Sequence, residues 1–127
     1  MVLENFQFAI EPYGLLQVHE WVHQTLRTIT SPVFNELVIW FLHMTHSWNL
    51  LNMMSVDGWK AVDASLNTLA GRNPDFRVVF RGDFEGDYGV IHQSIESNYL
   101  PLASLKGFVK FEQVLNVEDR LFNSITL

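Results

Sequence analysis

The spacing of hydrophobic residues near the N-terminus changes from a two-residue period to a helical one. Residues 6–10 alternate between apolar and polar side chains, which predicts a β-strand with one apolar face. A turn is expected at 11–14, where proline and glycine occur. Between residues 15 and 30 apolar residues recur every three or four positions, and Pro32 follows, so this segment is predicted to be an amphipathic helix.

Strands alternate with helices along the rest of the sequence. The patterns predict, in order, a strand at 37–42, an irregular insertion at 43–56, a helix from Asp57 to about Gly71, a strand at 76–81, a loop at 82–89, a helix at 90–98, a turn at 102–105, a strand at 108–114 and a short helix from Asn116. This alternation favours an α/β fold with a parallel sheet and right-handed crossovers. With 127 residues, we expect one domain, 1–127.

Short matching segments indicate that the strand and helix units are degenerate repeats. Leu26, Leu66 and Leu102 each open a four-residue segment that precedes a proline or a glycine and then an apolar strand. Their spacing falls in the range of about 20 to 50 residues that is typical of solenoid repeats. We therefore expect the three leucines to occupy equivalent buried sites in a leucine-rich-repeat-like solenoid fragment.

Three segments resemble the leucine-rich-repeat-like C-terminal part of F-box-type proteins of mushroom-forming fungi. They are ITSPVFNELVIWF at 29–41, WKAVDASL at 59–66 and LPLASLKGFVKF at 100–111. In that family a strand follows a Ser-Pro turn, a Trp-x-x-x-Asp-x-x-Leu helix comes next, and a Leu-Pro and a glycine precede the last strand. The residues that match are Trp59, Asp63 and Leu66 in the middle element and Leu100, Pro101 and Gly107 in the closing one.

The resemblance implies a non-catalytic protein-binding module, because the repeats of F-box proteins recruit substrates to a ubiquitin ligase. The F-box itself, a helical segment near the N-terminus, has no counterpart, since Met1 leads almost directly into the first predicted strand. We therefore expect a relative that keeps the recognition half, without a ligase role.

Composition and charge exclude several classes of partner. Fourteen acidic and eight basic residues give a net charge of -6, so the phosphate attraction that nucleic-acid binders rely on is missing. The longest apolar run, 37–42, is too short to span a membrane, and the N-terminus lacks the pattern of a signal peptide. Together with the absence of cysteine, this favours a cytoplasmic or nuclear protein that binds neither nucleic acid nor membranes.

Residues 19–23 form an HExxH sequence on a predicted helix. In zinc hydrolases the two histidines of this motif bind the metal and the glutamate activates water, which here would assign those roles to His19, His23 and Glu20. The apolar stripe of the helix, however, centres on Val22; His19 borders it, His23 lies to the side, and Glu20 points nearly opposite. We therefore favour a half-exposed amphipathic helix without metal.

A catalytic zinc site also needs a third protein ligand and a sheltered cleft. Glu36, His43 and His46 are the candidates, but none belongs to a recognisable second motif. A small zinc-dependent hydrolase, with zinc as its cofactor, therefore remains the alternative to the protein-binding module, for which we expect no cofactor.

Acidic residues also stand at alternate positions in the predicted loop at 82–89. Asp83, Glu85 and Asp87 resemble the start of a calcium-binding loop. Tyr88 occupies the position where such a loop needs glycine, and Ser94 the position of its bidentate glutamate. We therefore expect a solvated turn, in which Asp87 caps the following helix.

Four aromatic residues are candidates for contact with a partner protein. Trp21 and Trp48 lie outside the clearest apolar stripes, and exposed aromatic residues can mark a partner site. Phe6 and Phe8 belong to the first predicted strand, which no capping helix precedes. Because the unpaired edge of an apolar strand invites pairing with another chain, we expect self-association or partner binding through this N-terminal edge.

Overall fold

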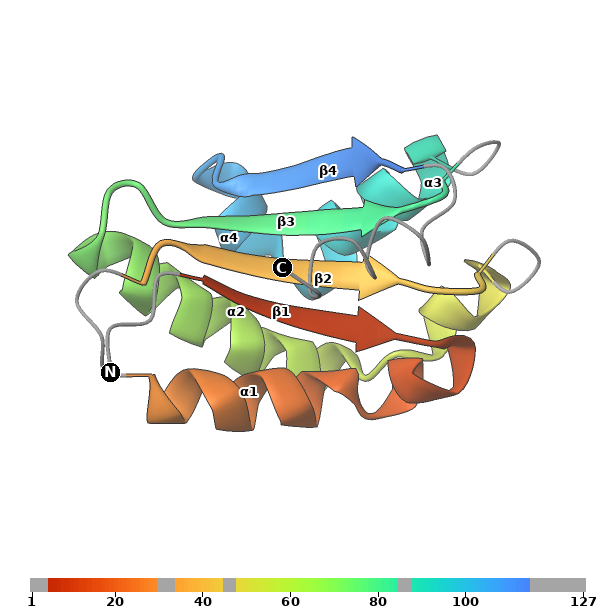
Figure 1. Ribbon diagram of the computed structural model, residues 1–127, viewed down its shortest axis with the longest axis horizontal. Coiled ribbons are helices and arrows are strands. Elements are labelled where there is room, and N and C mark those ends of the chain that lie inside the picture. Colours follow the sequence, from red (N-terminus) through yellow and green to blue (C-terminus); the bar gives the residue numbers. More distant parts are fainter. Residues whose placement is uncertain (1–4, 30–33, 45–47, 85–87, 115–127) are drawn as a thin grey trace, which may run out of the picture.

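The computed structural model describes residues 5–29, 34–44, 48–84 and 88–114, and these contain a four-stranded parallel sheet (Figure 1). Its strands are β1 (Asn5–Ile10), β2 (Glu36–Phe41), β3 (Arg77–Gly82) and β4 (Val109–Gln113). They lie side by side in chain order, β1-β2-β3-β4. Each strand was predicted to within one residue at either end, and the expectation of an α/β fold with a parallel sheet is confirmed.

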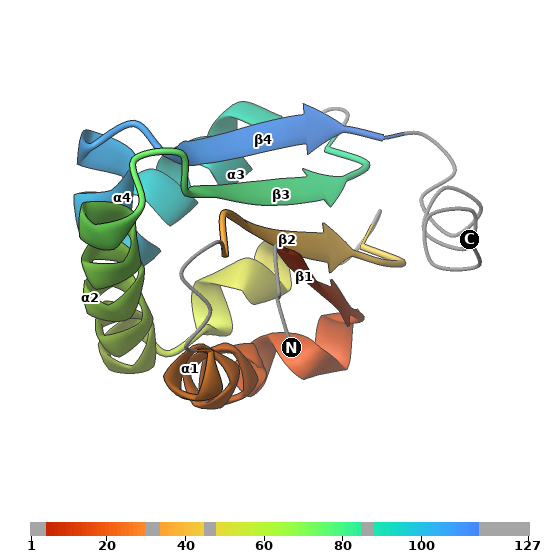
Figure 2. The same cartoon turned by 60° about the vertical axis from the view of Figure 1, so that its left-hand side comes forward.

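The helices lie together on one side of this sheet, as the two views in Figures 1 and 2 show. They are α1 (Val18–Thr28), α2 (Val56–Arg72), α3 (Tyr88–Ser94) and α4 (Pro101–Leu105), together with the 3-10 helices η1 (Pro12–Leu16) and η2 (Trp48–Met53) and the π-helical turn η3 (Ile95–Tyr99). This arrangement follows from the strand order, because right-handed crossovers between successive neighbours all pass over the same face.

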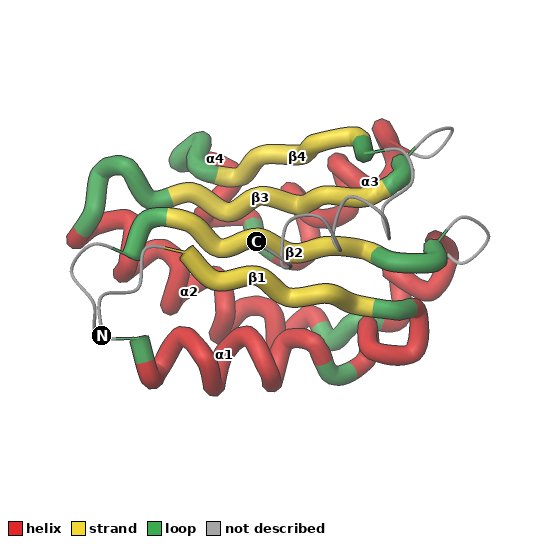
Figure 3. The backbone as a smooth tube through the Cα atoms, viewed as in Figure 1, coloured by secondary structure: helices red, strands yellow, loops and turns green. Residues whose placement is uncertain are grey.

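The main core lies between the sheet and the helices. Strand residues in register form rows of apolar side chains across it, such as Phe8, Ile39, Phe80 and Phe111. The rings of Phe80 and Phe111 stack at 5.3 Å between centroids. From the helices, Val22 and Leu66 pack into the same buried cluster. The tube in Figure 3 shows the chain alternating between strand and helix to build these two layers.

A smaller buried cluster lies on the opposite face of the sheet. It consists of Val38, Trp40 and Val79 and contains no residue from a described helix. The indole N–H of Trp40 donates to the side-chain oxygen of Gln7 at 2.7 Å, and the guanidinium of Arg81 lies 5.3 Å from the centre of the indole ring. Because β2 is buried on both faces, its sequence is a continuous apolar run instead of an alternating one.

The ends of α2 differ slightly from the prediction. Its N-cap is Ser55, whose hydroxyl accepts a hydrogen bond from the Gly58 N–H at 3.1 Å, so Asp57 lies in the first turn instead of capping it. The helix also continues through Gly71 to Arg72. It ends at Asn73, whose side-chain amide donates to the Phe34 carbonyl at 2.9 Å. A tertiary hydrogen bond, rather than the glycine, therefore marks its end.

The segment between β3 and β4 differs most from the prediction. The helix expected at 90–98 is divided into α3 and the turn η3, and the turn expected at 102–105 is the short helix α4. Leu102 is 46% exposed, whereas Ala103 is fully buried. The expectation that Leu102 is equivalent to the buried Leu26 and Leu66 is therefore wrong. The reason is that α4 begins at Pro101 and turns its alanine toward the core.

The insertion predicted as irregular at 43–56 contains the helix η2, which buries Trp48 and Leu51. The helix predicted from Asn116 lies outside the described residues, so the structure does not address it.

Candidate functional site

The HExxH residues lie on α1, where that helix meets α2. His19 packs against Gly58 so closely that a Cβ atom there would overlap its imidazole ring. The side chain of His19 is 14% exposed and that of Glu20 is 63% exposed, while His23 is half-buried. Glu20 therefore points to solvent while its neighbouring histidines lie partly in the helix interface, as the helical periodicity predicts.

Within the described part of the chain, neither histidine belongs to a group of three or more side chains that could hold a metal ion. The Nδ1 atoms of His19 and His23 are buried, and no described residue forms a hydrogen bond with them. Of the candidate third ligands, Glu36 binds Arg77 at 2.6 Å, and His43 lies 4.0 Å from a carboxylate oxygen of Glu11. His46 falls outside the described residues. Across the ranges that the structure describes, no three histidine, aspartate or glutamate side chains are grouped to hold a metal ion.

Of the three acidic residues in the loop at 82–89, Asp83 lies within the described residues. Asp83 accepts a hydrogen bond from the side-chain amide of Gln113 at 2.7 Å, and the oxygen of the same amide accepts one from the Phe84 N–H at 2.7 Å. Asp83 thus helps to join the ends of β3 and β4. Glu85 and Asp87 lie outside the described residues, as does the predicted helix cap at Asp87.

Asp63 is a buried carboxylate to which the motif analysis assigned no role of its own. It lies on α2 and is 2% exposed. Its two oxygens accept hydrogen bonds from the backbone N–H groups of Leu102 and Ala103, each at 2.9 Å. These are free donors at the first turn of α4, so Asp63 caps that helix from a distance and fixes it to α2. The Trp-x-x-x-Asp-x-x-Leu spacing marked this residue, but its bonding partners lie about 40 residues away.

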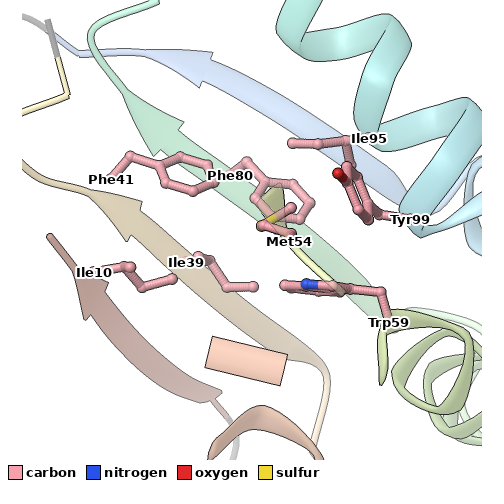
Figure 4. Close-up of a pocket in the computed structure, with 8 residues that line it drawn as sticks. All are labelled: Ile10, Ile39, Phe41, Met54, Trp59, Phe80, Ile95 and Tyr99. Atoms are coloured by element: carbon pink, nitrogen blue, oxygen red, sulfur yellow. The ribbon is translucent and has the colours of Figure 1, made fainter. Parts of the chain in front are cut away.

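A narrow internal gap lies between the sheet and the helices (Figure 4). No part of it is wide enough to hold a water molecule. The residues that line it are Ile10, Ile39, Phe41, Met54, Trp59, Phe80, Ile95 and Tyr99. The Tyr99 hydroxyl donates to the Leu51 carbonyl at 2.8 Å, whereas the indole N–H of Trp59 has no described partner. This gap is a feature of core packing and not a substrate pocket.

The four aromatic residues proposed to contact a partner differ in exposure. Trp21 is 43% exposed, as a contact residue should be. Trp48 is 8% exposed and packs against Phe84, with ring centroids 5.3 Å apart. The expectation of a contact role for Trp48 is therefore wrong, because η2 folds its indole into the core. Phe6 and Phe8 are half-buried.

Strand β1 lies at an edge of the described sheet. It pairs with β2, and no other described strand lies beside it. The Leu42 N–H donates to the Ile10 carbonyl at 2.7 Å, so the backbone groups of Ile10 face the β2 side. Successive residues of a strand point their N–H and C=O groups to opposite sides. The backbone groups of Gln7 and Ala9 consequently face away from β2, where a further strand could accept and donate hydrogen bonds.

Comparisons of the chain with protein-family models, with curated proteins and with solved structures find no match. Among the helices that the structure describes, none has both the length and the apolar character needed to cross a membrane.

Proposed function

We propose that this chain is a non-catalytic protein-binding module that binds its partner through the edge of strand β1. The observation that carries the proposal is the outward-facing backbone of Gln7 and Ala9 on a terminal strand of the described sheet. An unpaired edge of this kind offers a template for an added strand. Main-chain hydrogen bonds would supply affinity, and the side chains of alternate residues would supply specificity.

The side chains of β1 are consistent with such an edge. Phe6 and Phe8 are half-buried and pack together with their ring centroids 4.8 Å apart. Ala9 is exposed. The strand carries no lysine or proline, the residues with which sheet edges are commonly protected. Either a second copy of this chain or an extended segment of another protein has the backbone chemistry to add to it.

The finer part of the proposal is that the sheet belongs to a leucine-rich-repeat-like solenoid, similar to the recognition repeats of F-box-type proteins of mushroom-forming fungi. Three features support it: strands in chain order, helices on one side, and apolar rows in register. Leu26 and Leu66 are both buried. The units are unequal, since register partners are 41 residues apart at Glu36 and Arg77 but 31 apart at Arg81 and Glu112. A cytoplasmic or nuclear location fits such a role.

The edge can be tested by changing the exposed Ala9. Proline at this position removes an outward N–H without removing a β1–β2 hydrogen bond, whereas Ala9→Val keeps the N–H and serves as the matched control. We measure molecular mass against concentration by sedimentation equilibrium. We expect the wild type and Ala9→Val to associate with rising concentration, and Ala9→Pro to remain monomeric.

Two further results complete this test. An Ala9→Lys variant, which places a protective charge on the exposed edge without touching the core, should also remain monomeric and provides an independent variant if Ala9→Pro does not fold. If the wild type is monomeric at every concentration, an affinity selection of random extended peptides replaces the measurement of mass. The proposal is wrong if neither the chain itself nor any selected peptide binds, or if Ala9→Pro and Ala9→Lys bind as strongly as the wild type.

A further inference from the structure

A groove of about 380 Å³ lies between α1 and α2. The two helices run side by side with their carboxyl ends at the same end of the sheet (Figure 1). The apolar part of the groove is lined by Leu26, Ile29 and Leu69. Its volume falls within the range of about 300 to 1,000 Å³ that is typical of pockets for small ligands. Unlike the internal gap in Figure 4, it has room for more than a water molecule.

Two arginines that form no ion pair with a described carboxylate line this groove. Arg27 lies in the last turn of α1, and Arg72 is the last residue of α2. The other two arginines in the described ranges are neutralised, because Arg77 binds Glu36 and Arg81 binds Glu112, each at 2.6 Å. No described carboxylate forms an ion pair with Arg27 or Arg72. In a chain with a net charge of -6, two such arginines at one groove form a local positive site.

Polar groups of α2 complete the lining. Ser65 is half-buried and contributes a hydroxyl, and Thr68 contributes a second hydroxyl that donates to the Ala64 carbonyl at 3.1 Å. The groove therefore combines two guanidinium groups, two hydroxyls and an apolar wall. This combination suits a ligand with one strongly anionic end and one apolar end.

We propose that the groove binds a small organic phosphate monoester through Arg27 and Arg72. Guanidinium groups form paired, charge-assisted hydrogen bonds with phosphate oxygens. The leucine and isoleucine side chains would cover the apolar body of the ligand and exclude water from it. The site lies on the helices and involves no residue of β1, so this proposal can fail or succeed independently of the proposed edge interaction.

The arginines have a competing role that the experiment must separate. A positive charge in the last turn of a helix stabilises the helix through its dipole, typically by about 0.3 to 1 kcal/mol. Arg72→Lys keeps that charge but loses the planar pair of donors. If Arg72 only stabilises the helix dipole, Arg72→Lys should change neither the stability of the protein nor the affinity for the ligand. If Arg72 binds the ligand, Arg72→Lys should leave stability unchanged but weaken binding.

Phenyl phosphate is the probe, titrated into the full chain and followed by isothermal calorimetry. We expect saturable binding that weakens about tenfold in Arg27→Gln and in Arg72→Gln, because each loses a charge-assisted contact. Lys60→Gln is the matched control: it removes one positive charge from the exposed surface of α2 but does not line the groove. Its affinity should remain within about twofold of the wild type, and added salt should weaken binding.

Inorganic phosphate and benzyl alcohol test the two halves of the ligand separately, and both should bind more weakly than phenyl phosphate. The proposal is overturned if phenyl phosphate does not bind at millimolar concentration or if Lys60→Gln weakens it as much as the arginine variants do. It is also overturned if inorganic phosphate binds equally well, since the apolar wall would then play no part. Circular dichroism of each variant verifies that it is folded.

Discussion

At the scale of single residues, the buried Asp63 shows how one side chain joins segments distant in sequence. A buried carboxylate is unfavourable unless hydrogen bonds satisfy it. Both of its oxygens find backbone N–H donors on α4, so α4 is held in place by an acceptor on α2. The five residues of α4 could not form a stable helix alone. Asp63 thus supplies what the local sequence lacks.

The leucines proposed as repeat positions provide a matched pair of substitutions. Leu66 is fully buried, whereas Leu102 is 46% exposed. We expect Leu66→Ala to lower the free energy of unfolding by about 2 to 5 kcal/mol, through lost burial and a residual cavity. Leu102→Ala should lower it by less than about 1 kcal/mol. Urea denaturation measures both, and equal losses would contradict the difference in burial.

Tyr99 makes the free energy of unfolding depend on pH in the alkaline range. Burial raises the pKa of its phenol above the ordinary value of 10.0. The unfolded chain therefore ionises this group first, and the folded chain binds the proton more tightly. The resulting stability is present below about pH 10 and is lost as pH rises through the folded-state pKa.

The comparison with Tyr99→Phe isolates this effect. Loss of the hydrogen bond to Leu51 should lower the free energy of unfolding of this variant by about 1 kcal/mol at neutral pH. The loss should be no larger, because the Leu51 carbonyl still accepts a hydrogen bond from the Met54 N–H. Above about pH 10 its free energy of unfolding should fall less steeply than that of the wild type. Parallel curves from denaturation at a series of pH values would show that Tyr99 does not titrate on unfolding.

At the scale of elements, the strands were predictable because they are apolar runs bounded by turn residues. The strand 37–42, for instance, differs from β2 by one residue at each end. The structure of the segment from residue 88 to 105 was not predictable from the sequence, because tertiary contacts decide it. Pro101 and the distant Asp63 create α4 where the local sequence predicts a turn. Likewise, Trp48 has no periodic neighbours to reveal that η2 buries it.

The candidate sites also differ in whether the sequence alone could predict them. The orientation of Glu20 away from the core followed from the helical period alone. The groove between α1 and α2 could not be predicted from the sequence, because it depends on two arginines that are distant in sequence and belong to no motif. Such a site becomes visible only when the crossing of the helices is known.

Whether the HExxH residues of α1 bind zinc gives a further test at this scale. Because Glu20 points to solvent and no described group of three ligands surrounds His19 and His23, we expect less than one zinc per chain in protein purified without added metal. Glu20→Gln should alter neither stability nor peptidase activity. Atomic absorption measures the zinc, with His92→Ala as a control for adventitious binding. One tightly held zinc that is lost in His19→Ala or His23→Ala would instead support the hydrolase alternative.

At the scale of the whole molecule, each described strand pairs with the strand made just before it. The sheet can therefore be assembled in the order of synthesis, without waiting for a distant segment of the chain. At about 5 to 20 residues per second, a ribosome makes the 31 to 41 residues between register partners in roughly 2 to 8 s. During that interval the newest strand has one open side. For β2, which is apolar on both faces, the nascent chain therefore presents an unpaired edge of an apolar strand until β3 has been made.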